Sequence, residues 1–291
     1  MRVNPHVAGN WPSHVYIEWH PSEAAYELIS SLISSLQKSI DVNASSFDSP
    51  VQLSTFLTSD LGAPLPLHIS LSRPITLTTA DKDNFLKDLE ASIETCGVVP
   101  FELSCRGVEW HRTDESGRSF LVLRVRSSSS TGNTKDEGKN DDDSANNKSK
   151  NDSGGSNCNL ELTKLLRRCN DTAKTYGQPQ LYKWAEEAST AAVGAAFHVS
   201  IAWSFSKPTD RLKQLTDEVF NSVFGGKGTS AATRKLRTLK IPVEGVKAKI
   251  GNVVTHIPLP QIGRRKSSIS ASIGAVAAGG GKRKNVSLLG L

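Results

Sequence analysis

The chain has 291 residues, of which 37% are hydrophobic and 22% charged, and its net charge at pH 7 is +6. This composition is ordinary for a globular protein, and no run approaches the roughly 18 apolar residues of a membrane helix. The first residues lack the layout of a secretory signal, and the four cysteines show no CxxC spacing. We therefore expect a soluble intracellular protein with reduced thiols and no membrane segment.

Charge and composition divide the chain into four parts. The segment 127–159 has four lysines, six acidic residues and no large apolar side chain, and the tail 264–291 has six basic residues and no acidic one. Such segments cannot bury enough apolar surface to fold, which predicts a disordered insert and a disordered basic tail. The remaining blocks, 1–126 and 160–263, are predicted to be the N-terminal and C-terminal lobes of one domain.

The first block predicts a strand at 14–19, helices at 22–39 and 79–96, a strand at 67–72, and later strands near 98–104, 106–111 and 119–126. Alternating apolar residues indicate the strands, and apolar residues at helical intervals indicate the helices. The first helix begins with Ser-Glu, and Thr79 is the expected N-cap of the second.

The second block predicts helices at 160–176 and 209–224, a strand at 197–204 between them, and strands near 238–248 and 252–258. Both blocks share one order: helix, strand carrying His-x-Ser, helix, strands. This order predicts an α+β fold of two pseudo-symmetric lobes, each a mainly antiparallel sheet with helices outside, whose His-x-Ser strands face a central cleft. Periodicity leaves open whether the halves form one continuous sheet or two lobes.

Four histidines begin a His-x-Ser or His-x-Thr motif, which alone is weak evidence. They are His20, His68, His111 and His198. Apolar residues flank His68 on both sides (Leu67, Ile69, Leu71) and likewise His198 (Phe197, Val199, Ile201). His20 precedes a proline and His111 precedes an arginine, so neither has the flanks of a half-buried strand.

Side chains alternate along a strand, so the apolar flanks face a core and the residues between them face the other way. His68, Ser70 and Ser72 are therefore predicted on one polar face. His198, Ser200 and, with less support, Ala202 are predicted on another. Two such faces opposite each other bracket one phosphate.

Paired imidazoles fit ribonuclease-like phosphoryl transfer. One neutral imidazole takes the proton of a ribose 2′-hydroxyl as it attacks phosphorus, and one imidazolium protonates the departing 5′-oxygen. Serine hydroxyls donate hydrogen bonds to the phosphate oxygens. The sequence has no recognisable acidic set for a two-metal nuclease, which predicts an enzyme without metal or cofactor.

These residues resemble the 2H phosphoesterase superfamily, which has two His-x-Ser/Thr motifs. More specifically, the chain resembles the U6 spliceosomal RNA 3′-end-processing phosphodiesterase family in a fungal-like form. The resemblance rests on PHVAGNWPSHVYI, LHISLSRP, RSFLVLRV, FHVSIAW and VKAKIGNVVTHIPL.

The resemblance implies a nuclear 3′-to-5′ exoribonuclease that trims the uridine-rich end of U6 RNA, leaving a 2′,3′-cyclic phosphate or a 3′-phosphate. It implies that His68 and His198 are the acid–base pair, with His198 favoured as base, and that Ser70 and Ser200 bind the phosphate. The family stacks the terminal base on a tyrosine shortly before the second motif, where this chain has AVGAAF. Tyr182 and Trp184 are the candidates for that role, and a core or surface position is the alternative for each.

Three points stay open at this stage. The basic patch at 227–249 suits either a phosphate backbone or a solvated face, and the basic tail suits nuclear import, loose RNA contact or neither. The protein is expected to be a monomer. Two other functions compete with the exonuclease: a 2H enzyme that opens cyclic phosphates on other RNA ends, and an RNA-binding module without turnover.

Overall fold

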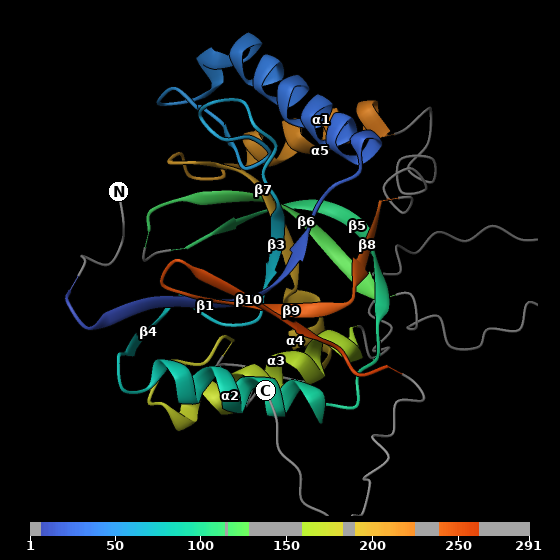
Figure 1. The fold of residues 1–291 in the computed structure, drawn as a ribbon. Coiled ribbons are helices and arrows are strands. Elements are labelled where there is room, and N and C mark those ends of the chain that lie inside the picture. Colours follow the sequence, from blue (N-terminus) through green and yellow to red (C-terminus); the bar gives the residue numbers. More distant parts are fainter. Residues whose placement is uncertain (1–6, 114–115, 128–158, 183–189, 225–238, 262–291) are drawn as a thin grey trace, which may run out of the picture.

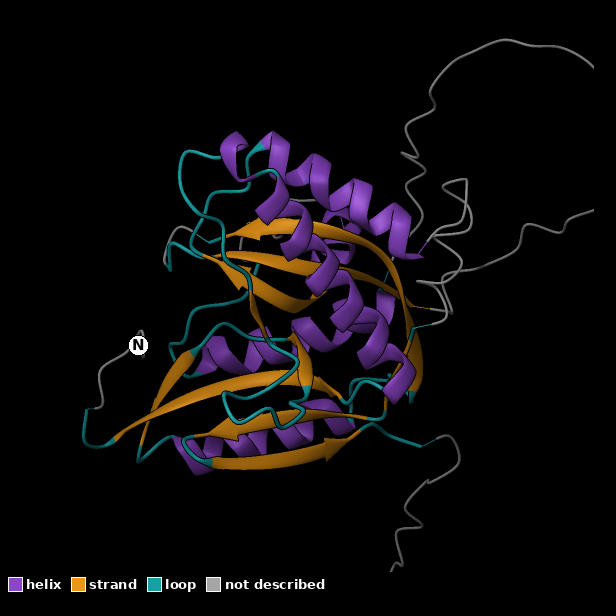
Figure 2. Cartoon of the chain, turned by 90° about the horizontal axis from the view of Figure 1, so that it is seen from above, coloured by secondary structure: helices purple, strands orange, loops and turns teal. Residues whose placement is uncertain are grey.

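The computed structural model describes residues 7–113, 116–127, 159–182, 190–224 and 239–261. The predicted tail and all of the predicted insert except Ser127 and Asn159 lie outside these residues. Within the described part, the chain forms two antiparallel sheets with helices on both sides (Figures 1 and 2). The predicted α+β class is therefore confirmed.

The elements follow the predicted order closely. The first half contains β1 (Asn10–Trp19), α1 (Glu23–Val42), the 3-10 turn η1 (Ala44–Ser46), β2 (Ser54–Thr55), β3 (Leu67–Ser70), β4 (Ile75–Thr78), α2 (Lys82–Glu94), β5 (Phe101–Arg112) and β6 (Ser119–Ser127). The second half contains α3 (Leu160–Thr175), α4 (Thr190–Ala196), β7 (His198–Ser204), α5 (Asp210–Phe224), β8 (Lys240–Val243), β9 (Gly245–Ile250) and β10 (Val253–Pro258).

Each sheet combines strands from both sequence blocks. The first sheet has the order β10-β9-β1-β3, with β4 also paired to β1, and the second has the order β2-β7-β6-β5-β8. The first block thus supplies β5 and β6 to the sheet of β7, while the second block supplies β9 and β10 to the sheet of β1. The predicted division into lobes 1–126 and 160–263 needs correction, because backbone pairing joins strands that lie far apart in sequence.

The helices form two pairs that flank the strands. Helix α1 packs against α5, and α2 packs against α3 on the other side of the molecule (Figure 1). Helix α1 begins as predicted, because the Ser22 hydroxyl accepts a hydrogen bond from the Ala25 N–H. The indole N–H of Trp110 on β5 donates to the Thr216 hydroxyl of α5 over 2.9 Å, which ties this helix to the second sheet.

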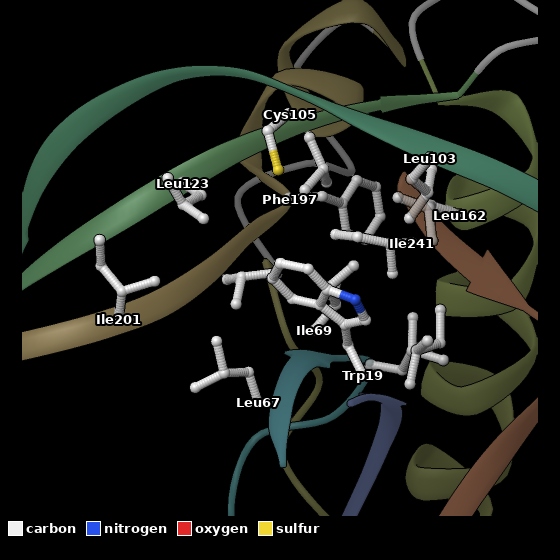
Figure 3. Close-up of a cluster of buried hydrophobic side chains, with 14 of the residues drawn as sticks. Trp19, Leu67, Ile69, Leu103, Cys105, Leu123, Leu162, Phe197, Ile201 and Ile241 are labelled. Carbon is white, nitrogen blue, oxygen red and sulfur yellow. The ribbon is translucent and has the colours of Figure 1, made fainter. Parts of the chain in front are cut away.

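One hydrophobic core connects the two sheets. Figure 3 shows Trp19, Leu67 and Ile69 of the first sheet gathered with side chains of the second sheet and of α3. Ile69 of β3 and Ile201 of β7 both belong to this core and expose 1% and 0% of their surface. Burying such side chains contributes about 1.5–3 kcal/mol each, so the core fixes how β3 and β7 lie relative to each other.

Two local predictions are corrected. Thr79 is not the N-cap of α2, because the helix begins at Lys82 and Asp81 precedes it. The Thr79 hydroxyl instead donates to the Gly9 carbonyl and accepts from the Trp11 indole N–H, at the start of β1. The strands predicted at 98–104 and 106–111 form the single strand β5, whose pairing with β6 shifts by one residue between Cys105 and Gly107. A β-bulge therefore replaces the predicted break.

Among the described residues, no helix combines the length and apolar content that crossing a membrane requires.

Candidate active site

The two His-x-Ser strands present the predicted faces. Leu67 and Ile69 on β3 and Val199 and Ile201 on β7 expose at most 2% of their surface. His68 remains exposed and Ser70, His198 and Ser200 are half-buried, because each points away from the core.

The expected continuation of these faces to Ser72 and Ala202 is wrong. Ser72 lies beyond the end of β3 and is buried, with its hydroxyl accepting from the Val15 N–H and donating to the Arg73 carbonyl. Ala202 is buried because the β6–β7 register shifts between Leu121 and Val122, which reverses the alternation along β7.

His68 and His198 come together although they belong to different sheets. Strands β3 and β7 are spatial neighbours (Figure 1). The two histidines are also close enough for the charge of His68 to lower the pKa of His198. The two imidazoles therefore lie within one local environment, as the sequence predicts.

His198 is held in one tautomer by its own backbone. Its Nδ1 lies 2.8 Å from the carbonyl oxygen of Ala196, which can only accept, so Nδ1 carries the proton and Nε2 has a free lone pair in the neutral ring. Burial lowers the pKa of His198 to about 4, and the bond to Ala196 offsets this only in part. Repulsion from His111, Arg124 and His68 lowers it further. The ring is therefore neutral at pH 7 and suited to accept a proton.

His68 lies in an aromatic setting on the first sheet. Its ring meets those of His14 and Tyr16 edge-on, with centroids 5.3 and 5.5 Å away. The side chain keeps contact with solvent, yet the protein atoms around it still lower its pKa by desolvation. A phosphodiester anion bound beside the ring favours the protonated form, which is the form that a general acid needs.

His14 is a site residue that the motif search misses. Its Nε2 lies 3.2 Å from the Ser70 hydroxyl, and burial lowers its pKa to about 4. The charge of His68 lowers this pKa further, and a hydrogen bond to the Ser72 backbone offsets the shift in part. His14 has no serine two residues later. It lies on the same face of the predicted strand as Tyr16, two residues away, and this polar face of the strand is the signal that indicates His14.

His111, which the flank test sets aside, also belongs to the site. It lies on β5, separated from β7 by β6, yet its ring centroid is 5.4 Å from that of His198. On β6, Arg124 stands directly opposite His198 and forms an ion pair with Glu109 over 3.3 Å. The residues that flank a histidine in sequence do not indicate whether it reaches the site from another strand of the sheet.

Tyr182 lies beside the site, whereas Trp184 lies outside the described residues. The Tyr182 hydroxyl donates to the Ala196 carbonyl over 3.1 Å, and its ring packs edge-on against buried Phe197 at 6.1 Å. Burial raises the pKa of Tyr182 to about 12, so it stays a donor at neutral pH. The base-stacking role of both aromatic residues stays a prediction.

A cavity of about 380 Å³ adjoins the site on the first sheet. Its lining includes Glu18, His20, Glu244, Gly245, Lys247 and His256. Glu18 stands opposite His68 in the β1–β3 pairing and contacts Lys247 at 3.5 Å. Of the basic patch predicted at 227–249, Lys247 thus reaches this cavity in an ion pair, while the positions up to 238 lie outside the described residues.

No group of three or more His, Cys, Asp or Glu side chains that could hold a metal ion occurs in the described part of the chain. The expected independence from metal stays a prediction.

Known proteins resemble this chain in sequence and in fold. The model of the HVSL family, described as an uncharacterised conserved protein, matches residues 1–258. U6 snRNA phosphodiesterase 1 of Neurospora crassa is 42% identical over 269 residues, which cover 90% of this chain and 67% of that protein. Usb1 of Kluyveromyces marxianus has a similar fold, with a TM-score of 0.51 and 14% identity over 85% of this chain and 98% of that one.

A second structure of the same Usb1, solved with uridine monophosphate, matches with the same values. At this identity the two solved structures bear on the fold alone. The sequence matches carry the assignment and confirm the predicted family resemblance. The chain belongs to the HVSL family and to the same family as U6 snRNA phosphodiesterase 1 of Neurospora crassa.

Proposed function

We propose that this protein is a 3′-to-5′ exoribonuclease of the 2H type that trims the uridine-rich 3′ end of U6 snRNA. The observation that carries the proposal is the neighbouring position of His68 and His198 on two His-x-Ser strands. The 42% identical relative is named a U6 snRNA phosphodiesterase, which supports the same substrate.

His198 acts as the general base. Its Nε2 accepts the proton of the ribose 2′-hydroxyl while the 2′-oxygen attacks phosphorus, and the bond from Ala196 keeps the ring oriented. The new bond joins the 2′-oxygen to phosphorus, and the bond from phosphorus to the 5′-oxygen of the terminal nucleoside breaks. His68 gives its proton to that departing oxygen, so the first round on an RNA with a free 3′-hydroxyl yields an RNA that ends in a 2′,3′-cyclic phosphate and a free nucleoside.

The serines bind the non-bridging oxygens as negative charge builds on them. Ser200 follows His198 on the same face of β7, and Ser70 follows His68 on β3. In the free protein the Ser70 hydroxyl is engaged by His14, so it turns from that ring to the phosphate when RNA binds. A water molecule can then attack the cyclic phosphate with the two roles exchanged: His68 takes a proton from the water and His198 protonates the departing 2′-oxygen. This hydrolysis opens the cyclic phosphate to a 3′-phosphate.

A single assay tests this proposal. RNA with an oligouridine tail is incubated with the full chain in EDTA, and the products and their 3′ ends are resolved. Stepwise shortening supports an exonuclease that needs no metal. Opening of a cyclic end without shortening would contradict the exonuclease and indicate a cyclic phosphodiesterase. RNA that is bound but not cut would indicate a binding module without turnover.

His68→Ala and His198→Ala serve as the matched variants in this assay. Each is expected to slow shortening about 10²–10⁴-fold, as loss of general acid or base help does, without loss of folding. Lys213→Ala, which changes an exposed side chain of α5 that is ion-paired with Asp210, is the control. Near-normal turnover by a folded His68 or His198 variant would remove that residue from the mechanism.

Residence in the nucleus is part of the proposal and is supported by the basic clusters of the tail at 264–266 and 282–284. The test compares the nuclear fluorescence of a tagged full-length chain with that of a tagged version ending at residue 263. Equal nuclear signal for both would show that these clusters are not the import signal.

A further inference from the structure

A group of aromatic side chains lies at the far end of β7 from His198. Trp203 and Phe205 meet edge-on with centroids 4.9 Å apart, and Phe56 and Phe120 stack at 6.2 Å. Phe120 stands directly opposite Trp203 in the β6–β7 pairing, which joins the two pairs. We call Phe56, Phe120, Trp203 and Phe205 the aromatic platform.

The aromatic platform shares a face with the catalytic residues. The extra residue at the bulge lies on β7, so the alternation along β6 continues unbroken through Phe120, Val122 and Arg124. Their partners on β7 are Trp203, Ser200 and His198, in that order. Val122 is buried but lies outside the hydrophobic core, which agrees with its position on the face of the histidines.

The platform is accessible and carries a positive charge. Phe205 exposes 67% of its surface, whereas large side chains on the opposite face of β6 and β7 are fully buried. The Arg118 guanidinium lies 4.2 Å from the ring centroid of Trp203 and 5.7 Å from that of Phe205. Exposed rings next to an arginine are the elements with which proteins hold single-stranded nucleic acid, since bases stack on the rings and the cation meets the backbone.

We propose that the aromatic platform stacks bases of the RNA strand on the 5′ side of the cleaved linkage. This inference rests on the proposed function and assigns a binding site to it. Trp203 is three residues from Ser200, roughly 10 Å along the strand at 3.3 Å per residue, so a strand of a few nucleotides reaches both. Only the 5′ side of the linkage has several nucleotides, because the departing product is a single nucleoside.

The platform supplies ring faces from three segments of chain on the side of Ser200. Stacking on rings is tolerant of base identity, so this site sets the length of RNA that binds well and not its sequence.

A binding titration tests the platform separately from catalysis. The full chain is titrated against fluorescently labelled 2′-deoxyoligouridines of two and eight nucleotides, which lack the attacking hydroxyl and are not cut. Phe205→Leu keeps an apolar side chain without a ring, Phe205→Tyr keeps the ring, and Leu61→Ala changes an apolar residue that is 96% exposed elsewhere.

Phe205→Leu is expected to raise the Kd for the eight-nucleotide strand about tenfold, the lower part of the range for one base stacked on a ring. The Kd for the two-nucleotide strand, and both values for Phe205→Tyr and Leu61→Ala, are expected to stay unchanged. An unchanged Kd for the long strand, or an equal loss for both strands, would overturn the inference. Cleavage by the wild-type chain is scored independently, so failure of the proposed function and failure of the platform are distinguishable.

Discussion

Tyr182 and His198 donate hydrogen bonds to the same acceptor, the carbonyl oxygen of Ala196. The tyrosine therefore fixes the position of the group that in turn orients the imidazole. Tyr182 also contacts Phe197, the residue that precedes His198. The Tyr182 side chain thus makes two contacts with the residues just before β7. We therefore regard Tyr182 as a positioning residue for His198, the proposed base.

Tyr182→Phe is expected to lower kcat about three- to tenfold and to leave KM nearly unchanged. The ring and its packing remain, while one hydrogen bond worth about 0.5–1.5 kcal/mol is lost, so the Ala196 carbonyl that orients His198 is held less firmly. Steady-state kinetics on an oligouridine-tailed RNA measure both constants. Tyr26→Phe, at a half-buried position of α1, is the matched control. If kcat is the same in both variants, Tyr182 does not position His198.

The acidic limb of the pH profile of kcat/KM is expected well below pH 6.5. The base works only when neutral, and the pKa of His198 is lowered to about 4, so activity is lost only as pH falls toward that value. His111→Asn removes a neighbour whose charge lowers this pKa, so the limb is expected to move to higher pH. Lys213→Ala, at an exposed position of α5, should leave the limb in place. A limb that stays fixed in the His111 variant would rule out this electrostatic contact.

Asn159 is expected to be the main support where the predicted insert joins the fold. Its side chain accepts from the Ser127 N–H at 2.7 Å and donates to the carbonyls of Val125 and Gly194. Asn159→Ala leaves these buried groups unpaired, so a loss of about 1–3 kcal/mol in the free energy of unfolding is expected in urea titrations. Asn10→Ala, at an exposed position, is expected to have little effect.

The same contact predicts that residues 128–158 can be replaced by a short Gly-Ser linker. Ser127 and Asn159 already touch, so a linker of about four residues closes the gap without strain. Melting temperature and turnover of the shortened chain are expected to match those of the full chain. A large drop in melting temperature would show that the segment contributes to the fold.

Gly245→Ala is expected to destabilise the protein by about 1–3 kcal/mol through overpacking. A Cβ there would overlap the His256 ring and lie 2.5 Å from the Ile257 carbonyl oxygen, both on β10. Gly107→Ala, where a Cβ meets nothing within 4 Å, is the control. Equal melting temperatures for the two variants would mean that β10 moves aside freely.

The sequence predicts the two His-x-Ser strands well because their signal is local. Leu67 and Ile69 on either side of His68 set the face of that histidine, and the alternation around His198 does the same. No tertiary information is needed for that step. The start of α1 follows equally from local periodicity and from Ser22 as N-cap, and both ends of α3 follow from periodicity, whereas α1 continues three residues beyond its predicted end, to Val42.

Partners across a sheet could not be predicted in this way. His14 and His111 reach the site from β1 and β5, and their places depend on strand order and register, which two-residue alternation does not specify. The bulge on β7 likewise turns Ala202 into the core against simple alternation. The division into lobes failed for the same reason, since strand pairing and not sequence order decides which elements form one sheet.

The interleaving of the two sheets affects synthesis as well as architecture. Strand β1 emerges first but pairs with β9, which begins at Gly245, so its sheet stays incomplete until nearly the whole folded part has been translated. A ribosome that stops early therefore releases a polypeptide with both histidine strands but no finished framework to hold them. We therefore expect a fragment that ends before Gly245 to lack the β1–β9 pairing and to be unable to hold His14 and His68 in the positions described.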